Sequence, residues 1–338
     1  MIPLLIALAT AAPPLAPPAP QPAEVKVFGD WAVACDDGRR CEAVSLTPGE
    51  DTIGPLNMML TRDPGPNGAM SIEIKSSQGI AGPAKLKLDG KTVAEGRLGP
   101  VGNLFLNGAA ALPLAEGLAN ANRLVVTGIG GTGLGSISMK GSGAAMRYID
   151  AEQGRAGGVT ALAAKGPAPA GMVPPPPPLP VVLAPPLVRD VAPPLPPAML
   201  ATLRKQNNCD FQTAAPDTTA TFTLDHRNTL VLLFCGSGAY NALSIPLTVS
   251  GGAVRPAEFD APVKSGDPDR PTMLMNAEWD RRTGILTARA LGRGLGDCGV
   301  KQQFVWDGQR FRLIEQEEMG ECRGAIAWPT TWRATVRR

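Results

Sequence analysis

Short, largely apolar runs separated by turn residues in the first half of the chain predict a series of short β-strands. Residues 31–35 and 41–46 flank the turn sequence Asp36-Asp37-Gly38 and read as a hairpin. Further strand-like runs lie at 56–60, 70–75, 84–88, 104–106, 124–127 and 136–139. Many short strands separated by Gly, Pro and Asn predict an N-terminal β-sandwich.

One short helix is expected within this sandwich. Ser142 is a candidate N-cap for a helix over 143–153, and Gly154 is placed to end it. Residues 112–119 are a candidate for one or two further helical turns.

The second half of the chain reads more clearly as antiparallel sheet. Strand-like runs at 221–224, 230–235, 242–249, 273–279, 285–290, 300–306 and 309–315 are separated by turn sequences, among them Asp307-Gly308. This pattern predicts a C-terminal antiparallel β-meander of seven or more strands. Whether the meander closes into a barrel is left open.

Prolines divide the chain. Of its 35 prolines, 14 fall in residues 167–197. Proline has a fixed φ and no amide donor, so this segment predicts a semi-rigid polyproline-II spacer. We therefore expect a Pro-rich linker at 166–198, which would separate a domain at 24–165 from a domain at 199–338.

The first residues predict export. Residues 2–12 form an apolar run that is shorter than the roughly 20 residues of a transmembrane helix, and Ala9-Thr10-Ala11 fits a signal-peptidase site. The interpretation is a signal peptide at 1–12 followed by a Pro-rich segment at 13–23, which places the protein in the periplasm or outside the cell.

Composition narrows the chemistry. The formal charge of +2 gives no reason to expect nucleic acid or an anionic membrane as a partner. His226 is the single histidine, so mechanisms that need two imidazoles are excluded. The string from Gly128 to Gly133 matches a dinucleotide fingerprint, but a strand-like run follows where that motif needs a helix, so a hairpin loop is the better interpretation. The sequence predicts no catalytic residues, no metal site and no cofactor.

Six cysteines in an exported chain indicate three disulfides, with 15 possible pairings. Local pairing is favoured by position. It joins Cys35 to Cys41 across the first hairpin turn, Cys209 to Cys235, and Cys298 to Cys322 around the Asp307-Gly308 hairpin.

Two segments are candidates for ligand or partner contact. The first is the predicted helix and its end, with Arg147, Tyr148, Asp150, Gln153 and Arg155. Arg147 and Asp150 are three residues apart, so a simple ion pair between them is the alternative.

The second candidate is the glycine-rich stretch 292–299. There Arg293 and Asp297 would supply polarity where backbone amides can approach a ligand closely. The alternative is a tight crossover beside Cys298.

The tryptophans of the second half are a further ambiguity. Trp279, Trp306, Trp328 and Trp332 could form a sugar-binding platform, but tryptophan in a small sheet is more often part of the core.

Several of these stretches together resemble a known family. The residues are Gly29-Asp-Trp-Ala-Val-Ala-Cys35 with Arg39-Arg-Cys41, then 147–155, then Gly294-Leu-Gly-Asp-Cys-Gly299 with Cys322-Arg-Gly and Trp328-Pro329. They resemble the uncharacterised bacterial family catalogued as domain of unknown function 1176, whose members carry six cysteines. The first half is also similar to invasion-associated locus B proteins, which implies an exported β-sandwich. Neither resemblance supplies catalytic residues.

The functional expectation is an exported, non-enzymatic protein that binds a protein or a cell-envelope component, including an envelope or host protein. Two alternatives remain open. One is a small-ligand carrier with a C-terminal β-barrel cavity, and the other is a carboxylate-based hydrolase of envelope glycans. The oligomeric state is not predicted.

Overall fold

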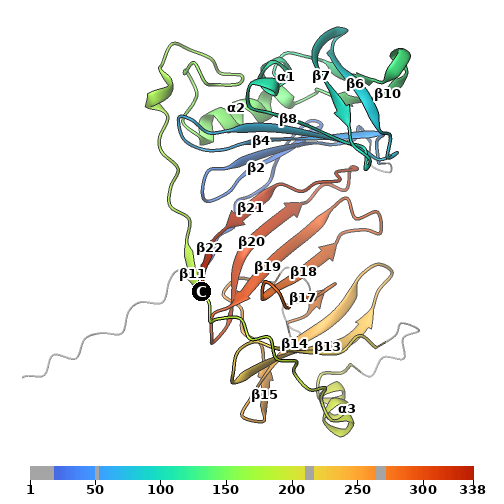
Figure 1. Cartoon of the computed structure of the whole chain (residues 1–338), viewed down its shortest axis with the longest axis vertical. Coiled ribbons are helices and arrows are strands. Elements are labelled where there is room, and N and C mark those ends of the chain that lie inside the picture. Colours follow the sequence, from blue (N-terminus) through green and yellow to red (C-terminus); the bar gives the residue numbers. More distant parts are fainter. Residues whose placement is uncertain (1–18, 50–52, 210–216, 264–271) are drawn as a thin grey trace, which may run out of the picture.

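The computed structural model describes residues 19–49, 53–209, 217–263 and 272–338 (Figure 1). The predicted signal peptide and most of the Pro-rich segment that follows it lie outside these ranges. Within them the fold is mainly β, with several antiparallel sheets and three α-helices. No helix among the described residues is long and apolar enough to cross a membrane.

Two antiparallel sheets make up the first half. The six-stranded sheet contains β1 (Lys26–Phe28), β2 (Trp31–Cys35), β3 (Cys41–Ser45), β4 (Leu56–Arg62), β5 (Met70–Ser76) and β8 (Asn103–Asn107), in that order. The four-stranded sheet has the order β10 (Gly133–Ser138), β9 (Arg123–Thr127), β6 (Gly82–Leu88) and β7 (Lys91–Leu98). Both sheets contribute side chains to one hydrophobic cluster. Along β5, buried residues alternate with partly exposed ones, because successive side chains point to opposite faces of the sheet.

The first half contains two α-helices rather than one, because the candidate turns at 112–119 form α1 (Leu112–Leu118). The predicted helix at 143–153 is α2 (Ser142–Glu152), and Gly154 follows it at φ +64°. Ser142 is not its cap: Gly141 takes that position, and the Ser142 hydroxyl lies near the carbonyl oxygens of Leu118 and Met139 at 2.5 and 2.7 Å. The hydroxyl therefore bonds backbone carbonyls outside α2 instead of the amides of its first turn.

The second half forms two five-stranded sheets, where the sequence predicted a single meander. The first contains β12 (Ala220–Thr223), β13 (Asn228–Ser237), β14 (Ala242–Ser250), β15 (Ala253–Pro256) and β16 (Leu274–Met275). The second has the order β17 (Glu278–Asp280), β18 (Ile285–Leu291), β19 (Gly299–Trp306), β20 (Phe311–Met319) and β21 (Thr330–Arg333). The run at 273–279 is split at Asn276, whose φ of +47° interrupts the extended backbone.

Aromatic rings fill the space between these two sheets. Phe311 packs edge-on to Trp279 at 6.4 Å between ring centroids and lies 5.3 Å from Trp306. Phe304 and Leu230 belong to the same buried cluster. Three of the four tryptophans of this half are buried, which matches the core interpretation.

The proline-rich segment runs along the molecule and contacts both halves (Figure 1). It includes the short strand β11 (Val181–Leu183), which pairs in parallel with β22 (Thr335–Arg337). Gly38 belongs to the first hairpin, and a Cβ added there would lie 2.7 Å from Leu179. Helix α3 (Pro197–Gln206) follows, with a proline in its first turn, where the missing amide costs nothing.

A shared apolar cluster joins the two halves. Ala32, Val44 and Leu46 of the six-stranded sheet pack against Met319 and Trp328 of the second half. The red strand β21 lies directly below β2 in Figure 1.

Ion pairs and hydrogen bonds surround this cluster. Arg323 pairs with Asp30, Arg333 pairs with Asp36, and the Thr330 amide donates to Glu42 at 2.8 Å. The domain division at the proline-rich segment stays a prediction.

Candidate functional site

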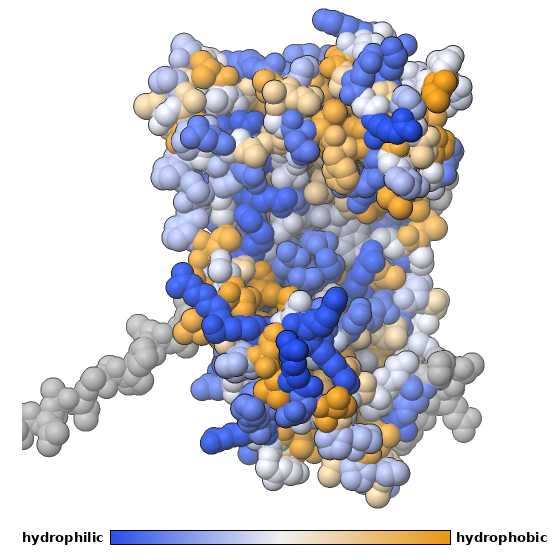
Figure 2. Space-filling model, in the orientation of Figure 1, coloured by the Kyte–Doolittle hydropathy of each residue, from blue (hydrophilic) through white to orange (hydrophobic). Residues whose placement is uncertain are grey.

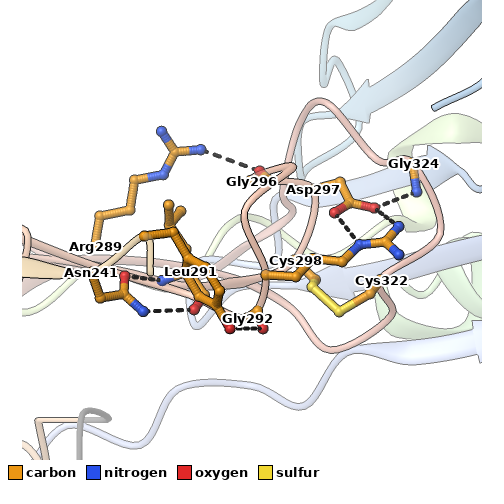
Figure 3. The surroundings of a disulfide bond; sticks show 11 residues. Asn241, Arg289, Leu291, Gly292, Gly296, Asp297, Cys298, Cys322 and Gly324 are labelled. Atoms are coloured by element: carbon orange, nitrogen blue, oxygen red, sulfur yellow. Dashed lines mark hydrogen bonds and ion pairs between the residues drawn. A yellow bond between two sulfur atoms is a disulfide. The ribbon is translucent and has the colours of Figure 1, made fainter. Parts of the chain in front are cut away.

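Three disulfides stabilise the described part of the chain, in the predicted local pairing: Cys35–Cys41, Cys209–Cys235 and Cys298–Cys322. The first closes the hairpin between β2 and β3, where the two cysteines are direct cross-strand partners. The third holds the glycine-rich stretch 292–299 against the segment after β20 (Figure 3). At Gly292 an added Cβ would lie 2.7 Å from the Cys298 sulfur, so the close approach depends on glycine.

Arg293 and Asp297 form an ion pair, and Asp297 precedes Cys298 of this disulfide. Arg293 Nε donates to Asp297 Oδ1 at 2.8 Å, and the Gly324 amide donates to Oδ2 at 2.7 Å. Asp297 is buried, and the hydrogen bond from Arg293 lowers its pKa below the ordinary value. The carboxylate therefore fixes the crossover to residue 324, which is the structural alternative considered for this stretch.

One face of the β17–β21 sheet carries charged side chains of both signs. In the strand register Arg289 lies opposite Lys301, and Lys301 lies opposite Glu317. Neighbouring positions on β18 point the other way, and Leu286 and Ala288 are buried against the aromatic core. The alternation of the strand thus places apolar residues inward and a charged row outward.

These outward residues line a groove of about 410 Å³ that Trp328 and Glu278 border. We call this surface the charged face and define it as Glu278, Arg289, Lys301, Glu317 and Trp328. The guanidinium of Arg289 stacks over the Trp328 ring, with Cζ 4.9 Å from the ring centroid. Trp328 also packs in the apolar cluster that the two halves share, so it links the groove to the contact between the halves.

Two asparagines fix the end of this groove. Asn276 Nδ2 donates to the Arg289 carbonyl at 2.8 Å and to Asn241 Oδ1 at 2.7 Å. Asn241 in turn bonds both backbone groups of Leu291 (Figure 3). The groove is therefore built on a backbone that side-chain amides hold in place.

The acids of this region share one lysine. Lys301 Nζ lies 2.7 Å from Glu317 and 3.9 Å from Glu315. Burial raises the pKa of Glu315, and the charge of Glu317 raises it further, while Lys301 acts against both effects. Charges of both signs therefore lie in contact on this face.

The helix candidates separate into inward and outward residues. Asp150 is fully buried and accepts hydrogen bonds from the amides of Leu162, Ala163 and Ala164 at 2.8–2.9 Å. Arg147 is exposed. Asp150 therefore holds the loop after α2 in place. Its carboxylate bonds these backbone amides instead of forming the ion pair with Arg147 that the sequence suggested.

Gln153 and Arg155 continue this buried network. Gln153 Nε2 donates to the carbonyls of Arg39 and Arg62 at 2.8 and 2.9 Å, and Gln153 Oε1 accepts from Arg155 Nε at 2.8 Å. Tyr148 is half-buried and lies against Phe28, with 6.1 Å between the ring centroids. The five residues thus do not converge on one surface.

A family model decides the relationship of the chain. The model described as "Protein of unknown function (DUF1176)" matches residues 25–335. The chain belongs to the DUF1176 family.

A curated relative supports this membership. The uncharacterized protein YpfG of Escherichia coli (strain K12) is 30% identical, over 91% of this chain and 92% of its own length. Among solved structures, invasion associated protein B from Bartonella henselae is similar, with 18% identity and a TM-score of 0.31, over 39% of this chain and 99% of that one.

The charged face of this DUF1176 protein could not be found from sequence motifs. Glu278, Arg289, Lys301 and Glu317 come from four strands, and only the strand register brings them together. The available signal was the alternation of Leu286, Ala288 and their polar neighbours in β18, which predicts one polar face but does not say which strands adjoin it.

Proposed function

We propose that this DUF1176 protein is exported to the periplasm and acts there without catalysis, by binding a protein or a cell-envelope component on the charged face. Three disulfides fit an oxidising, extracytoplasmic compartment. The single observation that supports the binding site is the groove itself, in which Arg289 stacks on Trp328 between acids and a lysine.

The composition of this groove favours a protein partner. Arginine is enriched among residues that contribute most to protein–protein binding, and Arg289 lines this groove. Arg289 is exposed, and within the described part of the chain its guanidinium donates to the Gly296 carbonyl at a long 3.4 Å. Its donors can therefore serve a partner at little cost.

Site-specific photo-crosslinking in the bacterial envelope tests this proposal. A photoreactive residue replaces Glu278, which is exposed at the rim of the groove, and a matched one replaces exposed Lys91 on β7. We expect a discrete crosslinked adduct from position 278 that is lost when Arg289→Ala and Lys301→Ala are combined with it. Equal adducts from both positions, or none from 278, would contradict the proposal.

A carboxylate-based hydrolase of envelope glycans is the second candidate, and one observation favours it. Glu315 has a raised pKa beside Glu317, as a general acid next to a second carboxylate would. Incubation of the purified protein with isolated envelope glycans tests it. Release of sugar fragments that Glu315→Gln abolishes would favour the enzyme over the binding protein.

The face seen in Figure 2 carries hydrophilic and hydrophobic residues side by side.

A further inference from the structure

A pocket in the first half combines apolar walls with one buried cation. It has a volume of about 400 Å³ and lies where β4 ends, between α1 and the loop after α2. Met70, Leu112 and Val159 give it apolar walls. Its polar groups come from Arg62, Asn67, Glu116 and Thr160, and the Glu116 carboxylate is paired with Lys165 at 2.5 Å. We call it the Arg62 pocket.

Arg62 is poorly satisfied by the protein. The residue is 8% exposed, and its Nε has no hydrogen-bond partner among the described residues. Nη1 donates to the Met70 sulfur at 3.7 Å, a weak acceptor. A buried guanidinium N–H without an acceptor is costly, so this group favours a partner with oxygen acceptors.

The two carboxylates whose charge acts on Arg62, Asp150 and Asp63, have other partners. Both oxygens of Asp150 accept backbone amides of the loop at 162–164. Asp63 pairs with Arg40 at 3.4 Å and is half-exposed. Neither carboxylate forms an ion pair with Arg62 in the described part of the chain.

A second cation adds to the positive potential. Burial lowers the pKa of Arg155 to about 10, and repulsion from Arg62 contributes to this shift. Arg155 is held in place by Thr160 Oγ1 at 3.0 Å and by the Gly65 carbonyl at 2.5 Å. Two fixed guanidinium groups near one pocket favour an anion within it.

We propose that the Arg62 pocket binds a carboxylate that carries an apolar chain. The planar guanidinium matches a carboxylate in a two-point hydrogen bond, and the apolar walls would bury the chain. The pocket falls in the size range of small-ligand sites. A free fatty acid and the C-terminal carboxylate of a peptide share this chemistry.

Calorimetric titration of the full mature protein tests the proposal, using octanoate, octanol and N-acetyl-leucine as probes. We expect octanoate or N-acetyl-leucine to bind at least about tenfold more tightly than octanol, because only the carboxylates can pair with Arg62. The ¹³C-methyl NMR signal of Met70 should shift with the same titration. Octanoate alone would indicate a fatty acid, and N-acetyl-leucine alone would indicate a peptide terminus.

Two variants separate binding from folding. Arg62→Met removes the cation and should abolish the preference for the carboxylate while the protein stays folded, because an unpaired buried charge is lost. Val159→Glu places an acid at the pocket on a side chain that is 54% exposed, so it should weaken carboxylate binding about tenfold without affecting the fold.

The proposal is overturned if neither carboxylate binds, if octanol binds as tightly, or if Arg62→Met and Val159→Glu both leave octanoate binding unchanged. These outcomes are independent of the charged face, which lies in the other half of the chain.

Discussion

At the scale of single residues, the buried polar groups are used mainly to fix the backbone. Asp150, Gln153 and Arg155 tie the end of α2 to the strands and loops around it. Asp297 does the same for the crossover beside Cys298–Cys322. Each of these side chains forms hydrogen bonds with backbone groups of loops or strand ends that have no backbone partner there.

Asp297 provides a pH-dependent test of this role. Its pKa is held below the ordinary value of 3.8 by the hydrogen bonds from Arg293 and the Gly324 amide. A carboxylate whose pKa is lowered by folding stabilises the fold at pH values above its pKa in the unfolded chain. This contribution is lost as the pH falls through its pKa in the folded chain. Asp297→Asn should lower the free energy of unfolding by about 2 kcal/mol at pH 7.

Urea unfolding at pH 7 and at pH 3 measures the difference in free energy of unfolding between the wild type and Asp297→Asn. This difference should be smaller at pH 3. The control is Glu95→Gln, which removes an exposed ion pair with Lys85 and should cost less than about 0.5 kcal/mol. A pH-independent difference for Asp297→Asn would mean that the ion pair is not its cause.

At the scale of elements, β11 shows where prediction from the sequence reached its limit. The apolar runs of β2 and β4, which are buried on both faces, and the alternating run of β5, which is buried on one face, were predicted. β11 lies among prolines that predict a spacer, and its pairing with β22 joins residues about 150 positions apart. β7 was missed because both of its faces are largely exposed and its sequence does not alternate.

Neighbouring residues of β11 test whether this strand is part of the fold. Val182 is buried against Val305 and Ile314, whereas Leu183 points outward and is 70% exposed. Val182→Ala should lower the free energy of unfolding by about 1–2 kcal/mol, because it removes buried methyl groups. Leu183→Ala should change it by less than about 0.5 kcal/mol.

Equilibrium urea unfolding of the two variants gives the comparison directly. If Val182→Ala and Leu183→Ala both lower the free energy of unfolding by the same small amount, the proline-rich segment does not pack on the second half.

At the scale of the whole molecule, the shared cluster around Val44, Met319 and Trp328 makes the two halves depend on each other. The charge pairs Arg323–Asp30 and Arg333–Asp36 cross the same boundary. This arrangement could not be predicted, because the proline-rich segment suggested two separate bodies and no motif marks the contacting residues. The cysteine pairing was predictable, because each disulfide is local in sequence.

The shared cluster predicts that the halves unfold together. Tryptophan fluorescence reports mostly on the second half, where four of the five tryptophans lie, and far-UV circular dichroism reports on both. We expect coincident transitions by the two methods. Val44→Ala, a change in the first half, should lower the free energy of unfolding measured by each method by about 2 kcal/mol. Two separate transitions, with fluorescence unaffected by Val44→Ala, would contradict this prediction.

We propose that this DUF1176 protein works outside the cytoplasm as a disulfide-stabilised binding protein. Mass spectrometry of the protein recovered from the periplasmic fraction, with and without reduction and alkylation, tests its export and its disulfides. We expect a mature start near residue 12 and three cystines, Cys35–Cys41, Cys209–Cys235 and Cys298–Cys322. A retained N-terminus with freely alkylated thiols in the cytoplasmic fraction would contradict it.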